Sequence, residues 1–395
     1  MTFRPRESAV VGGRFELRER IDSGGFASVW RAVDPDGRAV AVKCGRDETH
    51  DRETVRERFR NELRCFRRMD GPIAPGALVQ FVDGAVAEDV DGETVYVATE
   101  LVEGESLDSL ATPGVDALAA VGRPVAAALA YLHRRGVAYL DLKPNNVLRR
   151  RRGPPALIDF NAATVDGDPA PLFHQDGFKP PEQTPPDDGR AAGPRSDVYA
   201  LGALGTYLLT GDPAPAEAAE DGPIDPLELG GDCSAELAAV LRTATAPDPA
   251  ERYVDAGEFY AALAPLVGTD ALARLEGGGC GVTVHPGATV GRWSSDGPVP
   301  DVVLADPGEH LSTVHAALER RDGAWYLEDR SLNGTFVRAD QGLAYVVSEE
   351  GFNRQLEAGR TPPHPDPAES IRLADGDRIA PVGRDYGADV YFHVD

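Results

Sequence analysis

The segment Asp141-Leu142-Lys143-Pro144-Asn145-Asn146 constrains the fold of this chain more than any other part of the sequence. A short predicted hairpin follows it and leads to Asp159-Phe160, so two acids, an amide and a lysine are grouped around that hairpin. This spacing suits phosphoryl transfer, which needs a positioned hydroxyl and positive charge near phosphate oxygens. Asp141 is placed to accept a hydroxyl proton, while Asn146 and Asp159 offer oxygens suited to a Mg²⁺ ion that bridges nucleotide phosphates.

Lysine is scarce in the chain, which makes the position of each lysine informative. The only lysines are Lys43, Lys143 and Lys179, and two of them lie in candidate motifs. Lys43 ends the segment Val40-Ala41-Val42-Lys43, which predicts a strand from which its ammonium group reaches the same phosphates. Because nearly every other basic residue is arginine, Lys43 and Lys143 are candidate catalytic residues.

These motifs stand in the order found in the eukaryotic-type Ser/Thr protein kinases, and residues 14–267 resemble that family. The segment Ile21-Asp22-Ser23-Gly24-Gly25-Phe26-Ala27-Ser28-Val29 is similar to the glycine-rich loop that covers nucleotide phosphates. Residues 52–69 have the apolar spacing of an amphipathic helix. Glu62 on this helix is the expected partner that aims the Lys43 ammonium group at phosphate.

The resemblance also implies the residues of an ATP and Mg²⁺ site. A strand near residues 94–99 leads to Glu100-Leu101-Val102, the expected hinge whose backbone groups face adenine. The residues expected at ATP are Ile21, Gly24, Gly25, Val29, Ala41, Lys43, Glu100 and Val102. The expected catalytic residues are Lys43, Glu62, Asp141, Lys143 and Asn146, and the expected metal ligands are Asn146 and Asp159.

Motifs near the end of this half favour protein substrates. Pro180-Pro181-Glu182 is similar to the end of a kinase activation segment, and Arg252 is the expected partner of Glu182. Small-molecule kinases of similar fold generally lack this segment. The resemblance therefore implies transfer of the ATP γ-phosphate to serine or threonine hydroxyls of proteins. A small-molecule kinase of similar fold remains an alternative.

The sequence departs from the family pattern at several positions. The family's His-Arg-Asp is Tyr139-Leu140-Asp141 here, so the arginine that pairs with an activation-segment phosphate is missing. Thr164 is the only hydroxyl residue between Asp159 and Glu182. We therefore expect activity that does not require phosphorylation of this segment. Asn161 replaces a glycine, an exchange that is tolerable because asparagine accepts the left-handed backbone.

The formal net charge of −25 is spread along the 395 residues rather than gathered in a tail. A surface rich in Asp and Glu and poor in Lys is similar to the surfaces of proteins from salt-accumulating haloarchaea, where salt screens the self-repulsion. We therefore expect a halophilic archaeal source, with a basic partner as the alternative explanation of the charge. Nucleic acid is not expected as a partner, because phosphate contacts need a basic face.

The chain contains one basic run, Arg149-Arg150-Arg151-Arg152, between the expected catalytic loop at residues 141–146 and Asp159. Its place in the predicted hairpin indicates a solvated turn. The alternative is a surface that attracts an acidic or phosphorylated substrate.

The cysteines and the apolar runs indicate a cytoplasmic protein without membrane contact. No C-x-x-C pair occurs, which predicts reduced thiols for Cys44, Cys65, Cys233 and Cys280. The N-terminus has no apolar signal core, and no apolar run approaches the roughly 20 residues that span a bilayer. Residues 125–132 with their flanks predict a buried helix instead.

The character of the sequence changes near residues 268–280, where Gly277-Gly278-Gly279 indicates a linker. Short alternating segments then predict an all-β sandwich, at residues 281–285, 302–305, 324–328, 335–338 and 391–394. The expected fold class is multidomain α+β. The expected domains are a bilobal kinase domain at 1–267 (lobes at about 14–102 and 103–267), a linker at 268–280 and the sandwich at 281–395.

Residues 281–395 resemble forkhead-associated (FHA) domains, which bind phosphothreonine with loops at one end of a β-sandwich. The resemblance implies that Arg292 and Ser312 bind phosphate, that Asn333 holds the peptide backbone and that His315 braces the loops. The motifs in family order are Gly291-Arg292, Ser312-Thr313-Val314-His315, Asn333-Gly334-Thr335 and Leu373-Ala374-Asp375-Gly376-Asp377.

Two features separate this sandwich from the family pattern. Thr313 stands where a second basic residue is common, and residues 338–370 form an insertion in place of a short strand pair. The expected partner is a phosphothreonine-containing protein that the sandwich docks near the kinase. The alternative from another class is a pseudokinase scaffold whose main activity is phosphothreonine binding.

Overall fold

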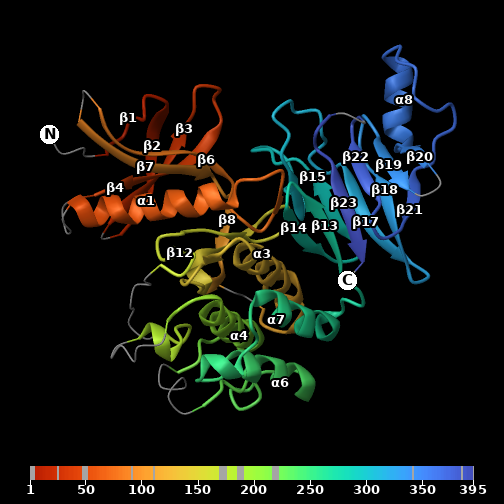
Figure 1. The fold of residues 1–395 in the computed structure, drawn as a ribbon. Helices are drawn as coiled ribbons and strands as arrows, with labels where there is room; N and C mark the ends of the chain where they lie inside the picture. The colour runs from red at the N-terminus through yellow and green to blue at the C-terminus, as the bar shows by residue number, and fades with distance from the viewer. Residues whose placement is uncertain are drawn as a thin grey trace.

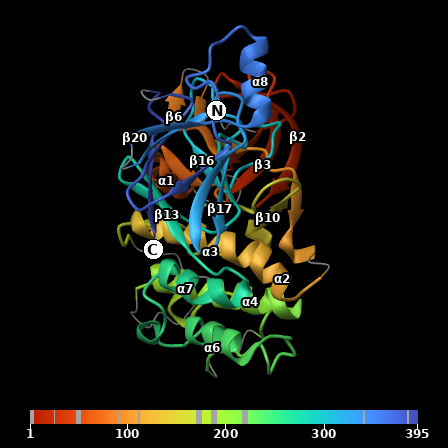
Figure 2. The same ribbon diagram turned by 90° about the vertical axis from the view of Figure 1, so that its right-hand side faces the viewer.

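The computed structural model describes residues 5–24, 26–46, 52–89, 92–109, 112–168, 176–184, 191–215, 222–339, 342–383 and 386–394. An N-terminal lobe of sheet stands above a helical lobe, and a β-sandwich packs beside the N-terminal lobe (Figure 1). After a quarter turn the sandwich lies in front of the N-terminal lobe (Figure 2). The expected order, a two-lobed domain followed by an all-β domain, is confirmed.

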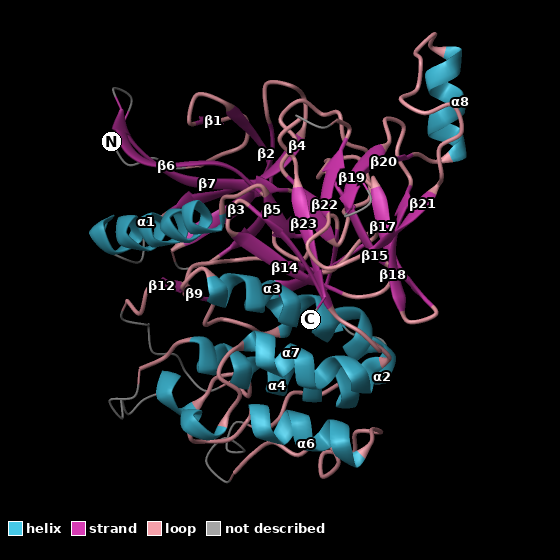
Figure 3. Cartoon of the chain, turned by 45° about the vertical axis from the view of Figure 1, so that its right-hand side comes forward, coloured by secondary structure: helices cyan, strands magenta, loops and turns pink. Residues whose placement is uncertain are grey.

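The N-terminal lobe is a six-stranded antiparallel sheet with helix α1 beside it (Figure 3). Its strands lie in the order β1 (Val10–Val11), β2 (Phe15–Ser23), β3 (Ala27–Val33), β4 (Ala39–Gly45), β7 (Gly92–Glu100) and β6 (Phe81–Asp89). Helix α1 (Arg52–Met69) has the predicted bounds. Its apolar face, with Phe59, Leu63 and Phe66, is buried, which is why the helix forms here.

The helical lobe is built around α3 (Arg123–Arg134) and α4 (Pro194–Thr210), whose residues are mostly buried. The other helices among the described residues of this lobe are α2 (Val115–Ala117), α6 (Ala235–Ala244) and α7 (Ala256–Leu263). The short strands are β8 (Gly104–Ser106), β9 (Val137–Ala138), β10 (Val147–Arg150), β11 (Ala156–Leu157) and β12 (Thr164–Val165). The 3₁₀ turns are η1 (Leu107–Ser109), η3 (Pro144–Asn146), η4 (Pro181–Gln183), η5 (Pro249–Glu251) and η6 (Ala264–Val267). β10 and β11 pair as the predicted hairpin, which brings the residues before β10 next to those after β11.

One helical stretch of the described residues, Val115–Arg134, is long and apolar enough to cross a membrane by length and composition alone. The expectation that no apolar run approaches this length was therefore wrong. The stretch contains α2, a π-helical turn (Leu118–Gly122) and α3, and 61% of its most apolar window is buried inside the protein. The helix expected at residues 125–132 is present and buried, because it forms the core of the helical lobe.

The sandwich consists of two six-stranded sheets. Each of the predicted strands is present in one of them. One sheet has the order β14 (Cys280–Val284), β13 (Ala273–Gly277), β23 (Val390–Val394), β22 (Arg378–Pro381), β19 (Thr335–Ala339) and β20 (Gly342–Val346). The other has the order β21 (Ser370–Leu373), β18 (Ala324–Asp329), β17 (Ala316–Arg321), β15 (Ala288–Gly291), β16 (Val302–Leu304) and β5 (Ile73–Pro75). Helix α8 (Glu349–Glu357), part of the insertion, projects from one edge (Figure 3).

Residues 273–280 of the expected linker, which spans 268–280, belong instead to the sandwich. Strand β13 pairs with both β14 and β23, so the sheet begins at Ala273. Gly277 faces Cys280 across a two-residue turn in which Gly278 and Gly279 have φ values of +58° and +78°. Positive φ at both central residues defines the tight hairpin turn that suits twisted strands. The glycine run is therefore a hairpin turn and not a linker.

The sandwich is joined to the lobes by backbone pairing. β5, which follows α1, pairs antiparallel with β16 and becomes the edge strand of a sandwich sheet. A Cβ atom added at Gly76 would lie 1.9 Å from the Pro300 carbonyl oxygen, and one at Gly153 would lie 2.4 Å from the carbonyl oxygen of Val299. Only glycine permits this approach at either position. The two halves therefore form one continuous structure rather than two tethered domains.

Candidate functional site

Lys43 lies between two carboxylates where the N-terminal lobe meets the helical lobe, a junction of Lys43, Glu62 and Asp159 that is called the cleft below. Its Nζ is 3.0 Å from Glu62 Oε2 on α1 and 2.7 Å from Asp159 Oδ1. Burial alone would lower the pKa of Lys43, but the carboxylates of Asp159 and Glu62 outweigh burial and raise this pKa. Burial raises the pKa of Glu62, whereas Lys43 holds the pKa of Asp159 low despite burial. The structure thus brings Lys43 and Glu62 together as expected and keeps the ammonium group charged.

Alternation along β4 decides which side chains face the cleft. Val40 and Val42 belong to a separate buried cluster, whereas Ala41 and Lys43 point to the opposite face of the sheet. Val29 on β3 lies directly across from Lys43 and shares that face. Three of the expected nucleotide residues are therefore grouped on one surface.

The remaining expected nucleotide residues lie at or just beyond the ends of strands β2 and β7. Ile21, near the end of β2, is 53% exposed, and Gly24 directly follows that strand. Val102 follows β7 and is half-buried. Gly25 lies outside the described residues.

An aromatic column connects α1 to the catalytic loop. The rings of Phe66 and Phe160 have centroids 5.1 Å apart, and those of Phe160 and Tyr139 are 5.2 Å apart. The backbone N–H of Tyr139 donates to Asp197 of α4 at 2.7 Å. Since the column is buried and anchored in both lobes, it holds Asp159, next to Phe160, in position against Lys43.

Asp141 accepts hydrogen bonds from three side chains. Lys143 Nζ lies 3.1 Å from each carboxylate oxygen, and Asn146 Nδ2 donates to Oδ2 at 2.7 Å. The third donor is Lys179, whose Nζ lies 2.5 Å from Oδ1. The motif at residues 141–146 predicts Lys143 and Asn146 as neighbours of Asp141, but it does not predict Lys179, which is 38 positions away. The scarcity of lysine was the available signal, because Lys179 is the third and last lysine of the chain.

Two residues next to the reacting groups adopt the left-handed backbone. Leu140 has a φ value of +63° and Asp159 one of +60°. Such values are uncommon outside glycine and cluster at functional sites. Asn161 has no positive φ, so the left-handed backbone that asparagine tolerates is not needed at this position. Its N–H instead donates to Asp159 Oδ1 at 3.3 Å, because the unusual conformation falls on Asp159 itself.

Asn146 and Asp159 form a donor set that fits Mg²⁺. Asn146 uses its amide nitrogen on the Asp141 carbonyl and carboxylate oxygens, which leaves its amide oxygen for another partner. Asp159 gives Oδ1 to Lys43, and its side chain is 36% exposed. Within the described residues no group of three or more His, Cys, Asp and Glu side chains could hold a metal ion. A hard cation with two protein oxygens, completed by water and phosphate oxygens, suits these residues.

The end of the expected activation segment is anchored in the helical lobe. Arg252 Nη1 lies 2.7 Å from Glu182 Oε1, and neither side chain is exposed. Ser196 Oγ of α4 donates to the same carboxylate at 2.7 Å. The structure therefore contains the pair that the sequence motifs indicate.

Glu100, the first residue of the expected hinge, has contacts that its sequence motif does not predict. Its backbone N–H donates to the Gln80 carbonyl oxygen at 2.8 Å. Its carboxylate accepts from Trp293 Nε1 of the sandwich at 2.8 Å and forms a buried ion pair with Arg150. Glu100 therefore connects the hinge to the sandwich through its side chain.

The run Arg149-Arg150-Arg151-Arg152 is only in part the expected solvated turn. Arg149 and Arg151 are exposed, but Arg150 is buried against Glu100. Arg152 donates to the Asp296 carbonyl oxygen of the sandwich at 2.9 Å. Arg150 therefore joins the hairpin to Glu100, and Arg152 joins it to the sandwich. A cavity of about 250 Å³ lies between this hairpin, the hinge and the loop from Trp293 to Val299.

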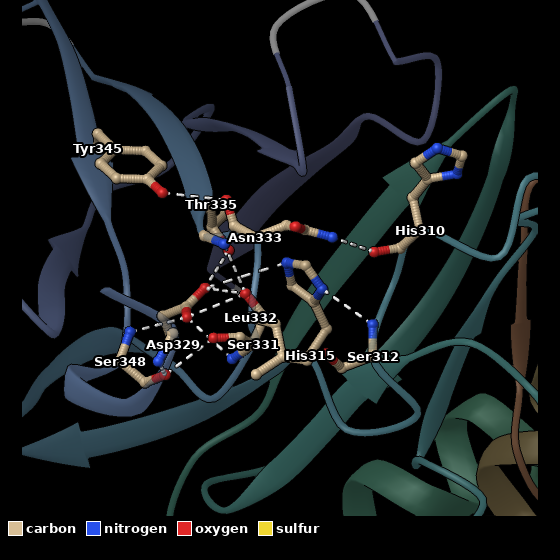
Figure 4. A network of polar contacts seen from close by, with 12 residues as sticks. His310, Ser312, His315, Asp329, Ser331, Leu332, Asn333, Thr335, Tyr345 and Ser348 are labelled. Atoms are coloured by element: carbon tan, nitrogen blue, oxygen red, sulfur yellow. Dashed lines mark hydrogen bonds and ion pairs between the residues drawn. The ribbon is translucent and has the colours of Figure 1, made fainter. Parts of the chain in front are cut away.

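The residues expected at phosphothreonine gather around one loop of the sandwich, residues 310–312. Arg292 Nε donates to the Leu311 carbonyl oxygen at 2.8 Å. Asn333 Nδ2 donates to the His310 carbonyl oxygen at 2.8 Å (Figure 4). Ser312 itself belongs to this loop. The structure thus brings Arg292, Ser312 and Asn333 to one end of the sandwich.

Buried polar residues hold these loops (Figure 4). His315 is 1% exposed and accepts the N–H of Ser312 at 3.4 Å, and burial lowers the pKa of His315 to about 4. Asp329 accepts from Thr335 Oγ1 at 2.7 Å and from the N–H of Ser348 at 3.0 Å. Burial raises the pKa of Asp329 to about 6. His315 lies where a bracing residue is expected, whereas the role of Asp329 was not anticipated.

The insertion packs against the loop that carries Asn333. Gln355 of α8 donates to the Leu332 carbonyl oxygen at 2.9 Å, and the Tyr345 hydroxyl donates to the Asn333 carbonyl oxygen at 3.0 Å. Arg360, just after α8, has Nη1 3.4 Å from Asn333 Oδ1. The insertion therefore places the Arg360 guanidinium beside the expected peptide site. The basic residue common at the position of Thr313 is absent from this chain.

Comparisons with known proteins divide the chain in the same way as the fold. The sequence model of the protein kinase domain family matches residues 15–228, which is more than half of the 395 residues. The model of the FHA domain family matches residues 288–349, a range that contains Arg292, Ser312 and Asn333.

Three of the similar curated proteins are bacterial kinases. The chain is 31% identical over 282 residues to serine/threonine-protein kinase PknA of Mycobacterium tuberculosis, covering 66% of this chain and 63% of PknA. It is 33% identical over 272 residues to PknL of the same species, covering 64% and 65%. It is 33% identical over 285 residues to the probable serine/threonine-protein kinase PknB of Corynebacterium glutamicum, covering 65% and 43%. The chain thus spans less than two thirds of each relative, and these matches do not support a halophilic archaeal source.

Proposed function

Because this chain belongs to the protein kinase family and ends in an FHA domain, we propose that it is an ATP-dependent Ser/Thr protein kinase that docks phosphothreonine-containing proteins. The observation that carries this proposal is the position of Lys43, held by Glu62 and Asp159 in the cleft. This arrangement aims one charged ammonium group at nucleotide phosphates, which is the requirement of phosphoryl transfer.

In the proposed reaction, the side chains around Asp141 act on the substrate and those around Lys43 act on the nucleotide. Asp141 accepts the proton of the substrate hydroxyl while that oxygen attacks the γ-phosphorus and ADP leaves. Lys43 neutralises charge on the nucleotide phosphates. Lys143, whose side chain is 33% exposed, is the cation available to the transferred phosphoryl group.

Asn146 and Asp159 would hold Mg²⁺ through the oxygens that Asp141 and Lys43 leave free. When bound, the ion neutralises charge on the β- and γ-phosphates. The nucleotide itself would lie against Val29 and Ala41 on the cleft face of the sheet. The other residues proposed at ATP are Ile21, Gly24, Gly25, Glu100 and Val102.

Two alternatives fit the structure less well. A pseudokinase scaffold would not need Lys43 between two carboxylates. Burying these charges costs free energy that their pairing only offsets, so the arrangement adds little to stability. A small-molecule kinase of similar fold would not need the buried Glu182–Arg252 pair that fixes the end of the activation segment. A protein substrate is therefore the better proposal.

The direct test is phosphosite mass spectrometry after incubating the full chain with Mg²⁺–ATP and a mixture of candidate proteins. Phosphoserine or phosphothreonine on these proteins supports the proposal. Parallel reactions at low salt and in several molar KCl test the salt-adapted surface inferred from the net charge of −25. Absence of phosphorylation at every salt concentration would refute the kinase assignment.

A cytoplasmic location is also part of this proposal. The four cysteines are free thiols, and three of them are buried. Burial raises the pKa of Cys44 to about 12, which keeps it protonated and unreactive. Reduced thiols of this kind suit a reducing compartment. Neither nucleic acid nor a membrane is proposed as a partner.

We expect Thr164→Ala to keep most of the kinase activity. Thr164 is 4% exposed and is the first residue of the two-residue strand β12. Its hydroxyl is therefore poorly accessible to another kinase. Leu140 cannot pair with a phosphate group. Phosphatase-treated protein and the variant should both stay within about three-fold of the untreated protein. A loss of about ten-fold or more, about 1.4 kcal/mol in the barrier, would show that phosphorylation is required.

We expect Arg292→Ala to weaken binding of a phosphothreonine peptide by roughly 10- to 100-fold, since a charge-assisted hydrogen bond contributes about 1.5–3 kcal/mol. Fluorescence titration of phosphorylated and unphosphorylated peptides measures the effect. Arg372→Ala is the matched control, because Arg372 is an exposed arginine on β21 of the same domain. Equal affinity of the unmutated protein for both peptide forms would contradict phosphothreonine binding.

A further inference from the structure

Lys179 is a buried lysine that the catalytic roles above do not use. Its side chain is 2% exposed, and its Nζ lies 2.5 Å from Asp141 Oδ1. The same Nζ donates to the Leu140 carbonyl oxygen at 3.1 Å. Removing an ammonium group from water is unfavourable unless it is well paired. A lysine in this place is therefore explained by what it does to its partners rather than by the stability it adds.

The backbone that carries Lys179 is anchored without it. Phe178 packs edge-on against Tyr207 of α4, with ring centroids 6.1 Å apart. On the other side, Glu182 forms its fully buried ion pair with Arg252. Neither the Phe178–Tyr207 contact nor the Glu182–Arg252 pair involves the Lys179 side chain. The backbone position of residues 178–182 therefore does not depend on the charge of Lys179.

With Lys179 in place, each oxygen of the Asp141 carboxylate accepts hydrogen bonds from two side chains. Oδ1 accepts from Lys179 and Lys143, and Oδ2 accepts from Lys143 and Asn146. Lys179 is the only one of these donors that comes from the activation segment. A carboxylate held in this way is oriented before the substrate arrives, which lowers the entropic part of the barrier.

We propose that Lys179 is a positioning residue that orients Asp141 and links the end of the activation segment to the catalytic loop without phosphorylation. Leu140 stands where an arginine would make this link through a phosphate group. Lys179 spans the same junction from the opposite side as a fixed cation. The inference rests on the proposed kinase function, in which Asp141 is the proton acceptor.

The test is the kinetics of Lys179→Met in the full chain, with a protein substrate identified by the phosphosite experiment. We expect kcat to fall at least about ten-fold and KM for ATP to stay within about two-fold, because Lys43 and Asp159 are untouched. The Lys179→Arg variant keeps the cation and should recover part of kcat. Thermal unfolding of both variants must accompany the kinetics, because Lys179→Met leaves the buried Asp141 carboxylate with only Lys143 and Asn146 as side-chain donors among the described residues.

Gln183→Met is the matched control. Gln183 is 1% exposed and donates to the same Leu140 carbonyl oxygen at 3.0 Å, but no hydrogen bond joins it to Asp141 within the described residues. Its kcat should stay within about three-fold of the unmutated protein. Equal losses in Gln183→Met and Lys179→Met would overturn the inference, because they would assign the effect to anchoring of Leu140.

A second readout is the combination of Lys179→Met with Asp141→Asn. If Lys179 acts through Asp141, adding Lys179→Met to Asp141→Asn should not lower the residual turnover further. An additional loss would indicate a separate structural role and overturn the inference. Normal turnover of Lys179→Met in an active enzyme would overturn this inference alone. An unmutated protein without phosphoryl transfer would overturn the proposed function and this inference together.

Discussion

Asp141→Asn is expected to lower kcat for phosphoryl transfer by roughly 10²- to 10⁴-fold while the affinity for nucleotide changes by less than about two-fold. Asparagine has the same shape as aspartate but cannot accept the proton of the substrate hydroxyl. Lys43 and Asp159, the residues proposed to bind the nucleotide and its metal ion, pair with each other at 2.7 Å rather than with Asp141. Steady-state kinetics with a protein substrate, together with an ADP titration by calorimetry, measure the two effects separately.

The controls for this variant come from the nucleotide side of the cleft. Lys43→Met and Asp159→Ala should lose productive binding of Mg²⁺–nucleotide as well as turnover, because they remove the groups proposed at phosphate and metal. Thermal unfolding must accompany the kinetics, since Asp141→Asn removes the carboxylate partner of the buried Lys179. Near-full activity of Asp141→Asn at every salt concentration would contradict its role as proton acceptor.

The parts of the site that the sequence predicted are those with strong local patterns. Apolar spacing alone sufficed for α1, whose observed bounds equal the expected ones. Glu62 then follows as the partner of Lys43 because it lies on the buried face of that helix. The Glu182–Arg252 pair spans 70 positions, and only the resemblance to a known family could indicate it.

The contacts between the two halves were beyond such reasoning. Strand β5 has three residues and no alternation that predicts a partner, yet it completes a sheet with β16 in the other half. The hydrogen bond from Trp293 to Glu100 joins residues 193 positions apart. Neither residue type indicates the other, because the pairing arises only when the sandwich packs on the hinge.

The glycine run at residues 277–279 shows a different limit. Glycine permits both a flexible linker and the positive φ values of a tight hairpin turn, so composition alone does not separate the two. The alternating residues on both sides, which form β13 and β14, were the decisive signal. Similarly, the insertion carried no recognisable motif, and the proximity of Arg360 to Asn333 emerges only from the packing of α8.

The second large effect is expected on stability, at the Glu182–Arg252 pair. Arg252 donates to both Glu182 oxygens, at 2.7 and 3.0 Å, and its Nε donates to the Ala246 carbonyl oxygen at 2.6 Å. Arg252→Met leaves the Glu182 carboxylate fully buried with the Ser196 hydroxyl as a neutral donor. Breaking a buried pair in this way should lower the free energy of unfolding by about 3–5 kcal/mol, measured by urea titration.

Two comparisons separate this effect from ordinary loss of an ion pair. Arg242→Met removes a pair with Asp225 in which the arginine side chain is 43% exposed, and it should lower the unfolding free energy by less than about 1 kcal/mol. The double variant Glu182→Leu with Arg252→Met should be more stable than Arg252→Met alone, because no unpaired charge remains buried. Equal destabilisation by Arg252→Met and Arg242→Met would mean that the buried pair does not anchor the segment. In that case the position of Lys179 against Asp141 would have to come from Phe178 and the catalytic loop alone.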